Sequence, residues 1–223
     1  MNTLMSKALA ALILGSALAT GIATAQTCDG VVVKDVCLPT DLGRLNISYG
    51  QFEDIYFLSG FPRLEYLDMG FNPVHDLSPL GSLPKLTYLD LGEMRLDGAA
   101  LDLAPLAGLT ALIELDISEN DITNLSALGN LPKLESLTAF DTDINDLAPL
   151  ANLHSLRVLQ LQDTPVSDIS ALAGLPNLEA LYLNGTEVSD LSALRSLPNL
   201  QILGLPNGSR ITGQSKIKAV LAE

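Results

Sequence analysis

The sequence predicts a solenoid of the α/β class, in which short parallel strands form one curved sheet and short 3₁₀ or irregular segments return the chain. One leucine recurs every 22 residues, except for a single step of 26, at Leu42, Leu64, Leu86, Leu112, Leu134, Leu156, Leu178 and Leu200. A second apolar column keeps the same phase at Phe61, Leu83, Leu109, Leu131, Leu153, Leu175 and Leu197. One unit cannot bury these side chains alone, whereas stacked units bury them in one continuous core.

Residues 1–25 have the pattern of a secretory signal peptide. Lys7 supplies the positive charge, an apolar run follows it, and Ala23-Thr24-Ala25 is a cleavage site of small residues. A membrane anchor is less favoured, because the apolar run is short for a spanning helix. We therefore expect an exported chain without stable membrane insertion, either periplasmic or secreted; a signal peptide does not distinguish the two.

Residues 26–41 are expected to form an N-terminal cap over the first repeat, which would otherwise expose its core. The segment contains Cys28 and Cys37, the two cysteines of the chain. Two cysteines in an exported protein indicate a disulfide, worth on the order of 2–3 kcal/mol by its loop length. Their spacing is not C-x-x-C, which disfavours a redox pair.

Residues 42–211 are expected to hold about eight repeat units, each with a strand at L-x-x-L-x-L. Two polar columns accompany the strands. An acidic column at the start of the return segments is expected to accept backbone N–H groups, and it comprises Asp54, Asp76, Asp102, Asn124, Asp146, Asp168 and Asp190. The other column comprises Gly50, Asn72, Met94, Asn120, Thr142, Thr164, Thr186 and Gly208.

These columns resemble those of the leucine-rich repeat family, in its short internalin-like bacterial form. The resemblance implies a parallel sheet lining a concave face, irregular returns on the convex face, and an asparagine that bonds neighbouring turns in the second polar column. Only Asn72 and Asn120 keep that asparagine. Threonine can supply a shorter hydroxyl version of its bonds, but Met94 cannot. We expect local irregularity near Met94 and the insertion at residues 98–101.

Residues 212–223 are expected to form a C-terminal capping helix. Ile217, Val220 and Leu221 have helical spacing, with Lys216 and Lys218 between them. The segment follows the point at which the leucine pattern falls out of register.

The residues marked x within each strand are expected to point to the concave face, since side chains alternate along a strand. Aromatic and acidic residues gather there and in the turn that follows. The candidate partner-binding residues are Tyr66, Asp68, Phe71, Tyr88, Asp90, Glu93, Glu114, Asp116, Glu119, Phe140 and Tyr182. Asp68, Asp90 and Asp116 are expected to be close neighbours, because adjacent strands lie about 4.8 Å apart.

Three interpretations of this acidic strip stay open. It is a solvated surface without a dedicated ligand, a site for a basic protein or peptide, or a Ca²⁺ site, although the sequence contains no compact calcium loop. Exposed aromatic residues beside charges are typical of protein interfaces. The formal charge of −14 disfavours binding to nucleic acid.

A non-enzymatic module for protein–protein interaction is the preferred hypothesis, and neither a cofactor nor a catalytic set is expected. His154 occupies a column that is otherwise mostly proline, and His75 adjoins the capping Asp76, so neither lies near a candidate nucleophile. The resemblance to internalins implies an alternative, a host-directed adhesin or virulence factor. The identity of the partner and the oligomeric state stay open.

Overall fold

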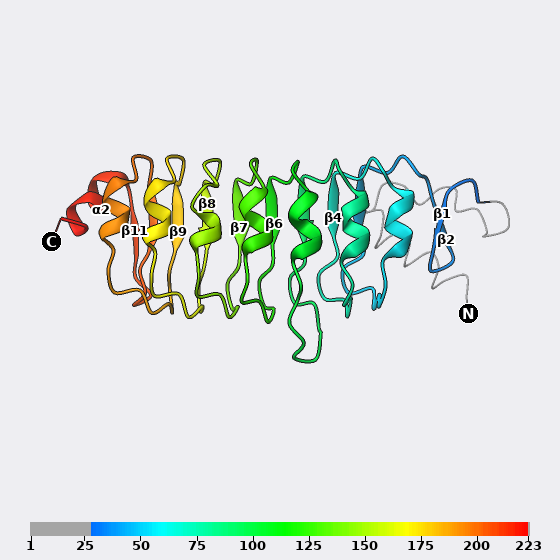
Figure 1. Ribbon diagram of the computed structural model, residues 1–223, viewed down its shortest axis with the longest axis horizontal. Helices are drawn as coiled ribbons and strands as arrows, with labels where there is room; N and C mark the ends of the chain where they lie inside the picture. The colour runs from blue at the N-terminus through cyan, green and yellow to red at the C-terminus, as the bar shows by residue number, and fades with distance from the viewer. Residues whose placement is uncertain (1–27, 223) are drawn as a thin grey trace.

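The computed structural model describes residues 28–222 as one elongated stack of repeat units with a cap at each end (Figure 1). The predicted signal peptide, residues 1–25, lies outside the described residues. Two sheets are present in residues 28–222: a two-stranded hairpin and a nine-stranded sheet that runs through the whole stack.

The nine-stranded sheet contains one three-residue strand from each of eight repeats and one further strand, β11, at its C-terminal end. Its strands are β3 (Arg44–Asn46), β4 (Tyr66–Asp68), β5 (Tyr88–Asp90), β6 (Glu114–Asp116), β7 (Ser136–Thr138), β8 (Val158–Gln160), β9 (Ala180–Tyr182), β10 (Ile202–Gly204) and β11 (Arg210–Thr212). Strands β3 to β10 are parallel and follow chain order, with register steps equal to the repeat period. The predicted solenoid is therefore confirmed.

The end of the sheet differs from the expectation of a wholly parallel sheet. Strand β11 pairs antiparallel with β10, so that Gly204 faces Arg210. The turn between them has Gly208 at φ +86°, a backbone conformation that favours glycine. The departure of the leucine pattern after Leu205 therefore marks a hairpin rather than a further parallel repeat.

Short 3₁₀ helices lie on the opposite face of the sheet (Figure 1). They are η2 (Tyr56–Gly60), η3 (Ser78–Ser82), η4 (Ala104–Gly108), η5 (Ser126–Asn130), η6 (Ala148–Leu150), η7 (Ser170–Gly174) and η8 (Ser192–Ser196). A 3₁₀ helix has three residues per turn, so leucines spaced by three share one face. In one unit the N–H of Leu80 bonds the carbonyl of Leu77, and Leu83 bonds Leu80, each at 3.0 Å.

The acidic column acts as predicted at the start of these returns. Six of its seven side chains accept the backbone N–H two residues further on, at 2.7–2.9 Å; they are Asp76, Asp102, Asn124, Asp146, Asp168 and Asp190. These bonds satisfy N–H groups that the short helices leave free. The column therefore serves the fold.

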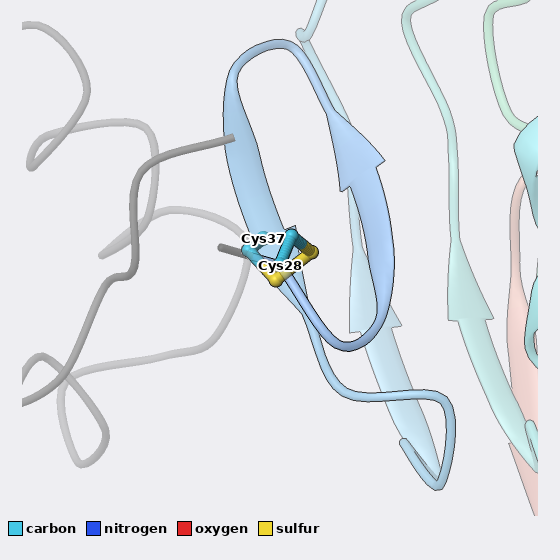
Figure 2. Close-up of a disulfide and its surroundings, with 2 residues drawn as sticks. All are labelled: Cys28 and Cys37. Carbon is cyan, nitrogen blue, oxygen red and sulfur yellow. A yellow bond between two sulfur atoms is a disulfide. The ribbon is translucent and has the colours of Figure 1, made fainter. Parts of the chain in front are cut away.

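Two caps close the ends of the core. At the N-terminus, β1 (Val31–Val33) and β2 (Val36–Leu38) form an antiparallel hairpin that buries Val33, Val36 and Leu38. A disulfide joins Cys28 to Cys37 beside this hairpin (Figure 2). At the C-terminus, helix α2 (Gln214–Val220) buries Ile217 against the last repeat.

The asparagine column explains how adjacent turns are joined. The amide of Asn120 donates to Leu91 of the preceding repeat at 2.7 Å, and its oxygen accepts the N–H of Met94 at 2.9 Å. By contrast, the hydroxyl of Thr142 donates only to Ala139 of its own turn, at 2.9 Å. Threonine thus satisfies one carbonyl without tying two repeats together, whereas asparagine does both.

The insertion after Met94 produces the irregularity that the sequence predicted. Met94 itself is buried, and the chain beyond it bulges out as the long loop at one edge of the stack (Figure 1). Three residues of this loop, Arg95, Asp97 and Gly98, have positive φ. The loop rejoins the next repeat where Leu101 donates to the carbonyl of Asp121 at 3.1 Å.

Candidate functional site

The exposed face of the sheet is built from the first and third residue of each strand, because the middle residue is buried in the core. Pairing in register places equivalent residues side by side. Two rows result: the first-residue row contains Arg44, Tyr66, Tyr88, Glu114 and Ser136, and the third-residue row contains Asn46, Asp68, Asp90, Asp116 and Thr138. A third row lies in the turn that follows each strand and contains Tyr49, Phe71, Glu93, Glu119, Asp141 and Asp163.

Asp68, Asp90 and Asp116 form a carboxylate row at the predicted positions. Each accepts the N–H two residues further on; for Asp90 the donor is Gly92 at 2.8 Å, and for Asp116 it is Ser118 at 2.9 Å. The side-chain amide of Asn46 also donates to Asp68 at 2.6 Å. The chain's own donors thus offset part of the repulsion between these like charges.

Burial, with a smaller contribution from repulsion, raises the pKa values of two carboxylates in the row. Burial raises the pKa of Asp90 to about 6, and the charges of Asp116 and Asp68 add to the effect, while the bond from Gly92 opposes it. Burial also raises the pKa of Asp68, against the bonds from Gly70 and Asn46. The row therefore holds partly desolvated negative charge, which a cationic group would stabilise.

Tyr66 and Tyr88 stack beside the carboxylate row. Their ring centroids are 4.2 Å apart and their planes differ by 9°. The guanidinium of Arg44 on β3 lies over the ring of Tyr66 on β4, 3.7 Å from the ring centroid. Burial raises the pKa of the Tyr88 hydroxyl, and the charge of Asp90 adds to the shift. Tyr88 is thus neutral at physiological pH.

A second aromatic stack lies in the turn row. Tyr49 and Phe71 have ring centroids 4.0 Å apart and planes that differ by 14°. The guanidinium of Arg95 lies 5.6 Å from the centre of Phe71 and forms an ion pair with Glu93 at 3.5 Å. Aromatic and acidic side chains therefore meet an arginine on this face.

The turn row is held in a left-handed backbone conformation. All six residues of the row have φ between 49° and 61°: Tyr49, Phe71, Glu93, Glu119, Asp141 and Asp163. Such angles are uncommon for residues other than glycine and unusual for bulky aromatic ones. Gly185 has φ +75° at the equivalent turn of the next repeat. The fold thus fixes the direction of these side chains, at a cost in backbone strain.

The other predicted residues are more dispersed. Glu114 is exposed and pairs in register with Tyr88, and Glu119 is exposed in the turn row. Phe140 and Tyr182 belong to later repeats and stack on no other ring in residues 28–222. Arg210 lies 5.7 Å from the centre of Tyr182. The structure thus brings together the N-terminal part of the predicted set and leaves Phe140 and Tyr182 apart from it.

Three contributors, Arg44, Arg95 and Tyr49, were not among the predicted site residues. Arg44 lies in the same row as Tyr66 and Tyr88, so its position in the repeat could have identified it as a site residue from the sequence alone. Arg95 lies in the irregular loop after Met94, where the repeat gives no register, and only the structure shows it over Phe71. Tyr49 heads the turn row and is 59% exposed.

Within residues 28–222 no group of three or more histidine, cysteine or acidic side chains is arranged to hold a metal ion. Within the same range, no helix has the length and apolar character needed to cross a bilayer.

Comparison with known proteins identifies leucine-rich repeat proteins as similar to this chain. A family model described as leucine-rich repeats in two copies matches residues 62–108 and 154–196. The internalin inlF of Listeria monocytogenes is 33% identical with a TM-score of 0.69, and the match covers 74% of this chain and 48% of inlF. Internalin C2 (inlC2) of the same organism is 30% identical with a TM-score of 0.66, covering 78% of this chain and 87% of that one.

A plant peptide hormone receptor, RGFR1, solved in complex with RGF2, has a TM-score of 0.59 at 16% identity, covering 74% of this chain and 29% of the receptor. At that identity the likeness shows the fold alone. No curated protein was matched by sequence. This chain spans about half the length of inlF, and nearly all of internalin C2.

Proposed function

The chain belongs to the leucine-rich repeat proteins in their internalin-like form, and from this premise we propose that it is an exported, non-enzymatic module that binds a basic protein or peptide. The binding surface is the exposed face of the sheet between β3 and β6. A role in protein–protein interaction accords with the family. We further propose that the chain is exported, that its partner is basic and that the partner binds this face.

The observation that carries the proposal is the carboxylate row beside the aromatic stacks. Asp68, Asp90 and Asp116 lie in register on three adjacent strands, and the pKa of Asp90 is raised to about 6 because its charge is poorly solvated. A cationic partner would stabilise this charge. Aromatic side chains beside it add apolar area of the kind found at interface centres.

The proposed export rests on the N-terminal sequence pattern and on the disulfide. The bond between Cys28 and Cys37 requires an oxidising compartment in most organisms. Cleavage after Ala25 is tested by N-terminal sequencing of the protein recovered from culture medium and periplasmic extract. Recovery of an uncleaved chain in the cytoplasm would contradict the proposal.

The choice of face is tested by neutralising the row without breaking the fold. Asparagine can accept the same backbone N–H groups as aspartate, so Asp68→Asn, Asp90→Asn and Asp116→Asn together remove three charges and keep the turns. The matched control makes the same change from aspartate to asparagine at Asp146, Asp168 and Asp190, which accept N–H groups on the opposite face. Both triple variants change the net charge equally.

Capture of partners from extracellular and periplasmic extracts is then compared for the purified chain and the two variants. We expect a partner that binds the wild type and the control but is lost with the sheet-face variant, and whose binding weakens with salt. Equal capture by all three proteins would place the binding surface elsewhere.

The identity to two Listeria internalins favours a second candidate, a host-directed adhesin. This candidate predicts saturable binding of the purified chain to host cells, again lost with the sheet-face variant. An endogenous partner predicts capture from the producing organism's own extract instead.

A further inference from the structure

Two rows on the exposed face contain the same sequence of side chains. The turn row begins with Tyr49 and Phe71 and continues with Glu93. The first-residue row contains Tyr66 and Tyr88 and continues with Glu114. In each row two stacked aromatic rings on adjacent repeats are followed, one repeat later, by a glutamate.

In the turn row, an arginine of the chain itself contacts both the aromatic stack and the glutamate. Arg95 lies over Phe71, the last ring of that stack, at 5.6 Å, and its guanidinium pairs with Glu93 at 3.5 Å. An arginine therefore fills the space where the rings end and the glutamate begins. It meets a π-face and a carboxylate at once, two groups that favour a guanidinium.

The first-residue row lacks the equivalent arginine. Arg44 covers Tyr66 at 3.7 Å, which shows that this row accepts a guanidinium on a tyrosine ring, but it does so at the β3 end. Tyr88 stacks on Tyr66 with one face, so its other face is directed toward β6, where Glu114 is its register partner. In the part of the chain that the structure describes, no ring or cation covers that second face.

The nearby arginines of the chain are already engaged. Arg44 lies on the opposite side of the stack, and Arg95 belongs to the turn row. Arg157 lines the same hollow as Glu114, but it lies between Glu135 and Glu179, with ion-pair distances of 3.5 and 2.9 Å. The group that completes the row must therefore come from another molecule.

We propose that the space between Tyr88 and Glu114 is a subsite for one arginine side chain of the partner, which stacks on the Tyr88 ring and pairs with the Glu114 carboxylate. The inference rests on the proposed function, because it assumes that a partner binds this face. Arginine is preferred to lysine, since a planar guanidinium can stack on a ring while its edge bonds a carboxylate. The adjacent carboxylates of Asp90 and Asp116 add attraction for the same positive charge.

Selection of random linear peptides on the purified full chain tests the subsite. Peptides are selected on the wild type and counter-selected on the Asp68, Asp90, Asp116 triple variant, so that only ligands of this face are retained. Each retained peptide is then resynthesised with every arginine replaced in turn by lysine or by the neutral isostere citrulline. Its affinity is measured for the wild type, Glu114→Gln, Tyr88→Leu and the control Glu187→Gln, an exposed glutamate that is not among the candidate partner-binding residues.

We expect retained peptides to contain an arginine whose replacement by citrulline, like Glu114→Gln or Tyr88→Leu, weakens binding by roughly two- to fivefold, the range for an exposed cation–π contact. Glu187→Gln should leave the affinity unchanged. The double change, citrulline in the peptide with Glu114→Gln in the chain, should cost no more than either alone, which separates a direct contact from a folding defect.

The outcomes separate this inference from the proposed function. Retained peptides that bind without arginine, or that ignore Glu114→Gln and Tyr88→Leu, would overturn the arginine subsite and leave the binding face in place. A selection that yields no peptide dependent on the carboxylate row would count against both.

Discussion

Replacing Asp90 by asparagine should stabilise the folded chain at neutral pH. The carboxylate is partly buried between two like charges, and its pKa is raised from 3.8 to about 6. An asparagine there keeps the acceptor for the Gly92 N–H, which the carboxylate now receives at 2.8 Å. Its amide can also donate to an adjacent aspartate, as Asn46 in the same row already does to Asp68 at 2.6 Å.

The size of the effect follows from the pKa shift. A rise of about 2 units corresponds to at most about 3 kcal/mol of lost stability at neutral pH. Because the side chain is partly exposed, solvent screening lowers this value, and we expect a gain of about 1–2 kcal/mol for Asp90→Asn. The raised pKa means that, between about pH 6 and pH 3.8, the folded state binds a proton at Asp90 that the unfolded state does not. The wild type therefore recovers this stability as the pH falls through 6, and the advantage of the variant should shrink toward pH 3.8.

Urea unfolding of the wild type and Asp90→Asn at about pH 7.5 and about pH 4 measures both parts of the prediction. Asp168→Asn is the matched control, because bonds from Ser170 lower the pKa of that exposed carboxylate. The control should therefore lose stability at the higher pH rather than gain it. A stabilisation by Asp90→Asn that is the same at both pH values, or a loss at neutral pH, would refute the argument from buried charge.

Three further changes test the fold. Asn120→Ala should cost about 2–3 kcal/mol in urea unfolding, since it leaves the N–H of Met94 and the carbonyl of Leu91 without partners; a loss below 0.5 kcal/mol would contradict this, by comparison with about 1 kcal/mol for a single ordinary hydrogen bond. Glu119→Gly should raise stability by up to about 1 kcal/mol by relieving φ +57°, measured in the same way, and no gain would show that the turn is not strained. Reducing the Cys28–Cys37 disulfide, which spans 9 residues, should lower the unfolding free energy by about 2–3 kcal/mol, with unchanged stability in dithiothreitol as the contrary result.

The buried part of the fold could be predicted from the sequence because it repeats. Every unit must place its leucines in one core, so the period alone located the strands, the returns and the rows of the exposed face. The register that pairs Asp68 with Asp90 and Tyr66 with Tyr88 follows directly from a 22-residue step. The same reasoning identified the capping role of the acidic column, which depends only on its place in the turn.

Features that break the repeat, or that depend on side-chain direction, could not be predicted. Strand β11 reverses direction, and nothing in the leucine spacing indicates an antiparallel end. The left-handed turn row contains glycine at Gly185, while Phe71 and Glu119 give no sign of positive φ in the sequence. Arg95 reaches Phe71 from an irregular loop, so its contact depends on a backbone path that the repeat does not specify.

Turns that contain asparagine and turns that contain threonine occur in different parts of the stack, and this difference bears on binding. Asn72 and Asn120 tie each of their turns to the preceding repeat; the amide of Asn72 donates to Ile47 at 3.0 Å, and its oxygen accepts the N–H of Phe52 at 3.0 Å. The threonine turns of later repeats bond only within themselves, as Thr164 does with Leu161. Asn72 lies in the repeat of Tyr66, Asp68 and Phe71 and bonds the repeat that contains Tyr49. Asn120 lies in the repeat of Asp116 and bonds the repeat that contains Tyr88 and Asp90.

A surface whose repeats are tied together loses less conformational freedom when a partner binds, and this saving improves affinity without any added contact. In this chain the tied repeats are the ones that carry the poorly solvated carboxylate of Asp90 and aromatic residues of the turn row, whose backbone conformation fixes the direction of their side chains. The smaller loss of conformational entropy would therefore apply to these residues. The C-terminal half has threonine in place of this asparagine, and its third-residue row contains Thr138, Gln160 and Tyr182 instead of carboxylates. The positive φ angles of the turn row continue to Asp163, but the asparagine turns and the desolvated carboxylates coincide only between β3 and β6, which is therefore where we place recognition.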